Sequence, residues 1–173
     1  MSTEPPLLLD TDFVSSFACV DRMDIIEGLY SGRMIVLEEV MVELERVPVL
    51  ASRVRQSIEK GHIRSEVLLA GSKEALEFVR LYESGRYGAG ESSCMSYLLC
   101  HEGTLASNNL RDVKRFCLEQ RIELLTTPDV LRGLYEDGNL SREEADLIWR
   151  EMVARKRKLP VATFGEYLAQ SGE

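Results

Sequence analysis

The sequence predicts an α/β domain in which a mainly parallel sheet is covered by helices on both faces. Short apolar runs, which are typical of buried strands, alternate along the chain with longer stretches of helical periodicity. The strand-like runs are apolar at nearly every position, as in strands that are buried on both faces of a parallel sheet. No internal repeat, low-complexity tract or linker divides the 173 residues, so we expect one domain over 1–173.

Four runs have the length and composition of short buried strands. Each contains three or four residues, mainly apolar, and is bounded by residues that favour turns or helix starts. Parallel strands need helical crossovers between them, and the spacing of the runs leaves room for these. The expected strands are 7–9, 34–37, 104–107 and 122–125.

Helices are expected between and after these strands, and capping signals fix several of their ends. Thr127 offers a capping oxygen just before Pro128, a residue favoured in the first helical turn. Ser141 and Glu144 form a capping box that opens a helix expected to run to about Lys158. The expected helical stretches are 14–29 in two pieces, 38–46, 49–60, 73–82, 91–101, 109–120, 128–135, 141–158 and a short turn capped by 163–166.

Composition excludes several classes of protein. Acidic residues outnumber basic ones by 29 to 21, and the net charge of −8 argues against a protein that coats nucleic acid by bulk electrostatics. No apolar stretch approaches the roughly 20 residues that cross a bilayer. The first residues lack the positive and apolar regions of a secretory signal, so we expect a cytoplasmic protein with no membrane partner. Two histidines, His62 and His101, argue against histidine-rich zinc sites.

Polar residues gather just after the expected strands, where ligands bind in parallel sheets. Asp10 and Asp12 follow the first strand. Ser107, Asn109 and Asp112 follow the third. The carboxyl ends of parallel strands meet at one edge of the sheet, so these side chains are expected to share a cleft.

Two further acids lie on helices that begin near this edge. Glu43 follows the second strand, and Glu91 lies in the first turn of the helix after the glycine-rich stretch 85–90. Carboxylates that share a cleft repel each other unless a cation lies among them. Oxygen ligands from separate elements are what Mg²⁺ or Mn²⁺ requires. The pattern therefore indicates metal-assisted attack of water on a phosphate ester.

Each of these acids also has an ordinary structural role that fits its position. Asp10 and Asp12 could cap the helix that follows them. Glu43 could lie on a solvated helix face, and Glu91 is placed where the helix dipole favours an acid. Asp112 could pair with a neighbouring arginine. The order of the acids along the chain, rather than any one of them, favours a functional site.

Four segments resemble the motifs of the PIN-domain nucleases, in family order and over about residues 7–127. Leu9-Asp-Thr-Asp-Phe-Val-Ser15 resembles their opening Leu-Asp-Thr-Asn motif. Ile35-Val-Leu-Glu-Glu-Val-Met-Val-Glu43 resembles the segment that carries a glutamate after the second strand. Gly88-Ala-Gly-Glu91 resembles their Gly-x-Gly-Glu, and Ala106-Ser-Asn-Asn-Leu-Arg-Asp-Val113 resembles the segment that supplies the last acid. Four motifs in order are far more specific than any one alone.

The resemblance implies a three-layer α/β/α sandwich that binds Mg²⁺ or Mn²⁺ and cleaves RNA. The implied catalytic residues are Asp10, Glu43, Glu91 and Asp112, of which Asp10, Glu91 and Asp112 are the expected metal ligands. Many members are the toxin half of a toxin–antitoxin pair and commonly dimerise, so an antitoxin protein and a second copy of the chain are candidate partners. Residues 128–173 would form a helical extension, like the extra helices of some uncharacterised PIN subfamilies.

The segments depart from the family pattern at four positions. Asp12 replaces the usual asparagine and Ser107 the usual threonine; with Asn109 these are the expected orienting or substrate-contacting residues. Asn108 and Asn109 stand where many relatives carry aspartate, which makes Asp112 the expected fourth acid. Asn109 lies three residues before Asp112, on the same helix face.

Two other functions fit parts of the sequence. The opening segment also resembles that of haloacid-dehalogenase phosphatases, with Asp10 as nucleophile and Asp12 as general acid/base, but nothing after Lys114 matches their later motifs. Alternatively, a PIN-like fold could bind RNA or a protein without cleaving. The basic run Arg155-Lys-Arg-Lys158 would then contact RNA phosphates or an acidic partner; its other interpretation is a solvated helix end favoured by the dipole.

Overall fold

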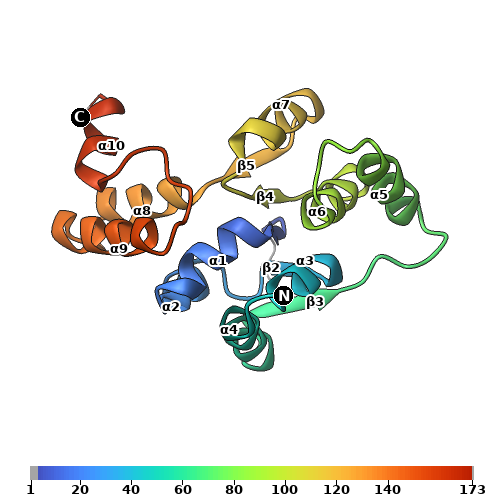
Figure 1. The fold of residues 1–173 in the computed structure, drawn as a ribbon, viewed down its shortest axis with the longest axis horizontal. Helices are drawn as coiled ribbons and strands as arrows, with labels where there is room; N and C mark the ends of the chain where they lie inside the picture. The colour runs from blue at the N-terminus through green and yellow to red at the C-terminus, as the bar shows by residue number, and fades with distance from the viewer. Residues whose placement is uncertain (1–3, 173) are drawn as a thin grey trace.

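The computed structural model describes residues 4–172, which form an α/β domain with an all-parallel central sheet (Figure 1). The strand order is β3-β2-β1-β4-β5. The strands are β1 (Leu7–Leu9), β2 (Met34–Leu37), β3 (Ile63–Glu66), β4 (Thr104–Ala106) and β5 (Glu123–Leu125). The helices are α1 (Thr11–Cys19), α2 (Met23–Tyr30), α3 (Glu38–Leu44), α4 (Pro48–Glu59), α5 (Lys73–Glu83), α6 (Ala89–Cys100), α7 (Leu110–Gln120), α8 (Thr127–Glu136), α9 (Arg142–Ala154) and α10 (Phe164–Gln170).

Strand β1 lies at the centre of the sheet and pairs in parallel with both β2 and β4. Leu7 is opposite Met34 on one side and Thr104 on the other. The chain moves outward from β1 to β2 and β3, then returns to the other side of β1 to form β4 and β5. The point where the order reverses therefore lies between the carboxyl ends of β1 and β4, which is where open α/β sheets bind ligands.

Helices lie on both sides of this sheet, as the two directions of strand progression require. Right-handed crossovers place the helices of β1–β2–β3 on one face and those that lead to β4 and β5 on the other. Figure 1 shows α1 and α2 on the opposite side of the strands from α6 and α7. The arrangement agrees with a three-layer α/β/α fold. Among the helices of residues 4–172, none is long and apolar enough to span a lipid bilayer.

The edge strand β3 is not among the four strands expected from the sequence. It pairs with β2 at the sheet edge, with Ile63 opposite Met34. Ile63 is buried, while Arg64 and Ser65 are exposed. A strand at the sheet edge can form with a single buried apolar residue. The segment therefore lacks the apolar run that identified β1, β2 and β4.

The C-terminal helices α8, α9 and α10 follow the last strand of the sheet, and their buried apolar residues belong to the same hydrophobic core as those of the sheet and α1. Figure 1 shows them gathered beside α1. The predicted apolar face of α9 is confirmed: Ala145, Ile148, Trp149 and Met152 are all buried. The Trp149 indole Nε1 donates to the Val161 carbonyl oxygen at 2.9 Å, which ties α9 to the segment before α10.

Two expected helix ends in this region were wrong. The N-cap of α8 is Thr126, whose hydroxyl accepts from the Asp129 N–H, because the Thr127 hydroxyl is used by Asn108. Helix α9 ends at Ala154 rather than near Lys158. Lys156 takes a left-handed conformation (φ 59°), and the Arg157 N–H donates back to the Met152 carbonyl at 2.9 Å, as in a Schellman C-cap. The basic run therefore lies in a loop, not on a helix.

Candidate functional site

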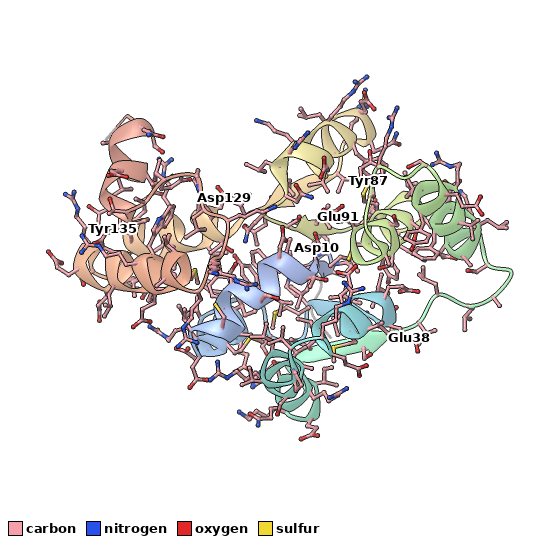
Figure 2. The ribbon with its side chains drawn as sticks, in the orientation of Figure 1. Asp10, Glu38, Tyr87, Glu91, Asp129 and Tyr135 are labelled. Atoms are coloured by element: carbon pink, nitrogen blue, oxygen red, sulfur yellow. The ribbon has the colours of Figure 1, made fainter. Side chains whose placement is uncertain are left out.

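Five acidic side chains line one cavity at the carboxyl ends of β1 and β4. The cavity has a volume of about 510 Å³. Figure 2 shows Asp10 and Glu91 near each other, between the start of α1 and the start of α6. All four expected catalytic acids and Asp12 reach this cavity: Asp10, Asp12, Glu43, Glu91 and Asp112.

Asp10 links the two strands that flank the reversal of strand order. It caps α1 by accepting the Thr11 N–H at 2.7 Å, and its other oxygen accepts the Ser107 hydroxyl at 2.8 Å. The side chain is almost wholly buried. Burial raises the pKa of Asp10 well above its ordinary value, and the negative charges of Asp12 and Glu91 raise it further. The same carboxyl group thus caps α1 and lines the cavity.

Asp12 lies in the first turn of α1 and accepts from the segment after β4. Its Oδ1 accepts the Asn108 N–H at 3.1 Å and lies 3.4 Å from the Ser107 hydroxyl. Burial raises the pKa of Asp12, while the hydrogen bond from Asn108 and the positive charge of Lys158 oppose that rise. Asp12 is therefore hydrogen-bonded to the segment after β4, and the charge of Lys158 from the C-terminal extension acts on it without an ion pair in the described part of the chain.

Asn108 has a structural role that sequence reasoning missed. Its side-chain amide donates to Thr127 Oγ1 at 2.8 Å, and its Oδ1 accepts the Thr127 N–H at 2.8 Å. The same amide also donates to Ser16 Oγ at 3.2 Å. Asn108 thus joins α1, the end of β4 and the start of α8. A single sequence offers no signal for this, because the partners lie far apart along the chain.

Glu43 is held in the wall of the cavity by two donors. Its Oε2 accepts the Thr11 hydroxyl at 2.5 Å, and its Oε1 accepts the Gly90 N–H at 2.9 Å. A Cβ at Gly90 would lie 2.9 Å from Glu43 Oε2 and 3.0 Å from Thr11 Oγ1, so a larger residue there would displace the Glu43 carboxylate from its present position. The three residues join α3, α1 and α6 around the cavity. The expected catalytic role of Glu43 is thus accompanied by a positioning role.

Asn109 joins the two acids that face each other from α6 and α7. Its Nδ2 donates to Glu91 Oε1 and to Asp112 Oδ2. Glu91 also accepts the Gly88 N–H at 3.3 Å, in the capping box of α6. Burial raises the pKa of Glu91, and the charges of Asp12 and Asp112 add to the rise. The amide thus lies between carboxylates that repel each other.

The oxygen atoms that line the cavity are of the kind that bind a hard divalent cation, although the side chains are not arranged to coordinate one as they stand. Within residues 4–172, no three Asp, Glu, His or Cys side chains are grouped so that they could hold one metal ion as they stand. Hydroxyl and amide donors from Thr11, Ser107 and Asn109 satisfy the carboxylates instead. Carboxylate and amide oxygens are nevertheless the ligand types that Mg²⁺ and Mn²⁺ prefer. Coordination would require the Asn109 amide to release Glu91 and Asp112.

Basic side chains form another part of the same cavity. Lys156, Arg157 and Lys158 line it from the loop after α9, and Arg86 lines it from the loop before α6. The cavity therefore combines carboxylates from the sheet with cations from two loops. Sequence reasoning did not place these cations beside the acids, because it expected the basic run on a helix.

A second, mainly apolar groove adjoins the acidic cavity. It has a volume of about 740 Å³ and includes Leu118, Leu124 and Pro160 among its lining residues. Asn108, Asn109 and Lys158 line both spaces, so the two are neighbours. Residues far apart in the sequence build this groove, which no motif indicated.

Comparison of the chain with models of known protein families gives no match, and comparison with curated protein sequences gives none either.

Proposed function

We propose that the protein is a metal-dependent nuclease of the PIN type that hydrolyses phosphodiester bonds in RNA. The observation that carries the proposal is the meeting of Asp10, Glu91 and Asp112 in one cavity where the strand order of the parallel sheet reverses. A phosphate cannot approach this group of carboxylates closely unless a cation offsets their charge. Burial, and after it the repulsion between neighbouring carboxylates, raises the pKa values of Asp10 and Glu91, and a bound cation would favour their charged forms.

In this proposal Asp10, Glu91 and Asp112 hold Mg²⁺ or Mn²⁺. Such an ion, when bound, stabilises charge on the phosphate and lowers the pKa of a coordinated water. Ser107 orients Asp10 through its hydroxyl, and Asn109 orients Asp112 through its amide. These residues set the positions of the acids relative to one another.

Glu43 and Asp12 complete the proposed site from two sides. Through Thr11 and Gly90, Glu43 fixes the starts of the two helices that carry Asp10 and Glu91. Asp12 is available to accept a proton or to orient water beside Asp10, because it lines the cavity and its pKa is raised.

Two features favour a polynucleotide over a small phosphate monoester. The acidic cavity adjoins the apolar groove, so a chain could extend from one into the other. Several cations lie beside the acids, which suits a ligand with more than one phosphate. RNA is proposed over DNA because the four ordered motifs resemble those of a family that cleaves RNA. The toxin role, an antitoxin partner, homodimerisation and a cytoplasmic location stay predictions of the sequence.

The test is incubation of the purified protein with mixed RNA in Mn²⁺, in excess chelator, and beside a p-nitrophenyl phosphate assay. We expect Mn²⁺-dependent RNA cleavage that chelator stops and that the Asp112→Asn variant lacks. Asp10-dependent release of nitrophenol with intact RNA would instead support the phosphatase interpretation. RNA binding without cleavage would support the binding module. Either result would overturn the nuclease proposal.

A further inference from the structure

Residues Arg155, Lys156, Arg157 and Lys158 form a segment that we call the basic strap. Its start is fixed by the C-cap of α9, in which the Lys156 N–H donates to the Val153 carbonyl and the Arg157 N–H to the Met152 carbonyl, both at 2.9 Å. Helix α9 itself is anchored by the fully buried Trp149. The strap is thus attached to a packed element, and its position does not depend on its own side chains.

The cations of the strap are not used to stabilise the fold through ion pairs. Within residues 4–172, no ion pair joins any of these four side chains to a carboxylate, whereas Arg115 and Arg150, for example, pair with acids on their own helices. Within the strap, Arg157 Nε donates to the Arg155 carbonyl at 3.3 Å. Arg155, Lys156 and Lys158 are exposed and Arg157 is half-buried.

These unpaired cations nevertheless lie beside the acids of the site. Lys156, Arg157 and Lys158 line the same cavity as Asp10 and Asp112. These three cations of the strap form no ion pair with the acids of the cavity within residues 4–172, so their donors are free for an anionic ligand. The protein has a net charge of −8, so a polyanion is repelled by most of its surface and attracted mainly where cations gather.

The number of cations indicates what this anion is. A metal held by the acids would engage one phosphate, and a small monoester has no second phosphate for the strap. In a polynucleotide, the phosphates that flank the reacting one lie a few ångströms away and carry a charge each. We propose that Lys156, Arg157 and Lys158 bind the backbone phosphates next to the bond that is hydrolysed and so set the position of the RNA in the site. This inference rests on the proposed nuclease function and adds the substrate-positioning element to it.

The test compares two triple variants that remove equal charge. The strap variant is Lys156→Gln, Arg157→Gln and Lys158→Gln. The control is Arg46→Gln, Lys60→Gln and Lys73→Gln, at exposed positions outside the acidic cavity and without ion pairs within residues 4–172. Binding of a fluorescently labelled 2′-O-methyl RNA 12-mer is measured by anisotropy in Ca²⁺ over a series of salt concentrations, with gels to confirm that the probe stays intact.

We expect the strap variant to bind at least about tenfold more weakly than wild type at low salt. The slope of log Kd against log salt should fall by roughly 0.7 for each phosphate that the variant no longer neutralises. The control variant should match wild type. In Mn²⁺, cleavage of an unmodified RNA should show a raised KM and a nearly unchanged kcat for the strap variant, because binding of a flanking phosphate stabilises ground state and transition state alike.

The outcomes separate this inference from the nuclease function itself. If wild type cleaves RNA and the strap variant matches the control in Kd, salt slope and KM, the strap assignment is wrong while the nuclease stands. If wild type binds RNA through the strap but cleaves none, the strap assignment stands and the nuclease is wrong. If wild type neither binds nor cleaves RNA, both are wrong.

Discussion

Asn109 Nδ2 lies 2.9 Å from Asp112 Oδ2, and the same nitrogen also donates to Glu91. One neutral amide thus stands between two carboxylates that come from different helices. An amide can reduce their repulsion by hydrogen bonding, but it adds no positive charge. We interpret Asn109 as the group that hydrogen-bonds both acids when no ion is present. When an ion binds the acids, we expect these hydrogen bonds to break.

Replacing this amide by a carboxylate should make the fold more dependent on metal. In Asn109→Asp, a donor becomes a third acid beside Glu91 and Asp112, so the chelator-treated protein should melt below wild type. Added Mn²⁺ should raise the melting temperature more in the variant than in wild type, because the ion then offsets more charge. Differential scanning fluorimetry with and without Mn²⁺ measures both effects. An equal Mn²⁺ response in the two proteins would contradict this role for Asn109.

The buried carboxyl of Asp10 should give a specific pH dependence. Because its folded pKa is raised, Asp10 favours folding fully below its unfolded pKa, and this contribution is lost as pH rises through the folded pKa. Asp10→Asn cannot ionise, and it keeps one acceptor oxygen in place of the two that accept from the Thr11 N–H and the Ser107 hydroxyl. Without metal, the stability of the variant relative to wild type should therefore increase as pH rises from about 5 to 8. Urea unfolding at several pH values measures this, and a constant difference would show that Asp10 does not carry the effect.

The same substitution should also weaken the response to metal. Mn²⁺ needs an ionised ligand, so Asp10→Asn should show a smaller thermal shift on Mn²⁺ addition than wild type. Melting curves across a Mn²⁺ titration give the comparison. Equal shifts in the two proteins would remove Asp10 from the proposed ligands.

Cleavage should depend on Asp112 far more than stability does. Asp112 is half-buried at the start of α7, and its side chain accepts from the Asn109 amide. Asp112→Asn should abolish Mn²⁺-dependent RNA cleavage and leave the melting temperature nearly unchanged, since the amide oxygen of the new side chain can still accept from Asn109. A gel assay and a melting curve on the same preparation decide it. Full activity in the variant would remove Asp112 from the site.

The central strands and the acids could be predicted from sequence because their signals are local. The runs at β1 and β2 are apolar throughout, and Asp10 follows β1 directly, so the topology of a parallel sheet brings Asp10 to the site. The bonds from Ser107 to Asp10 and from Gly90 to Glu43 join segments that are 97 and 47 residues apart. Only the folded chain shows such pairings. The motifs identified the acidic residues, but not the groups that donate hydrogen bonds to them.

The basic strap shows a different limit of sequence reasoning. Helix ends are predicted from glycine or proline, and the end of α9 has neither: a lysine, Lys156, takes the left-handed position that glycine usually fills. The helical pattern therefore seemed to continue to Lys158. Strand β3 also lacks the expected signal, because Ile63 is its one buried residue and the segment has no apolar run.

A side chain at Gly90 should destabilise the fold, whereas one at another helical glycine should not. In Gly90→Ala the new Cβ would lie 2.9 Å from Glu43 Oε2, so the carboxylate must give up its present bonds. We expect a loss of about 1–3 kcal/mol in unfolding free energy and a marked loss of cleavage. Gly133→Ala is the matched control, because nothing lies within 4 Å of its Cβ position in α8. That control should be neutral or stabilising by up to about 1 kcal/mol. Chemical denaturation that ranks the two variants the other way would contradict the packing around Glu43.

The C-terminal extension should contribute to stability and, through α9, to the site. Trp149 is fully buried and its ring lies 5.7 Å from that of Phe164 and 5.2 Å from that of Tyr167, between ring centroids. Trp149→Ala should cost about 3–5 kcal/mol of unfolding free energy, as removal of a buried aromatic side chain does. Trp149→Phe should cost less, because it keeps a ring in the cluster and loses the bond to Val161 and part of the ring volume rather than the whole side chain. The two variants should rank in this order in urea unfolding. Acrylamide should also quench the native tryptophan fluorescence poorly, and free quenching would show that α9 is not packed as described.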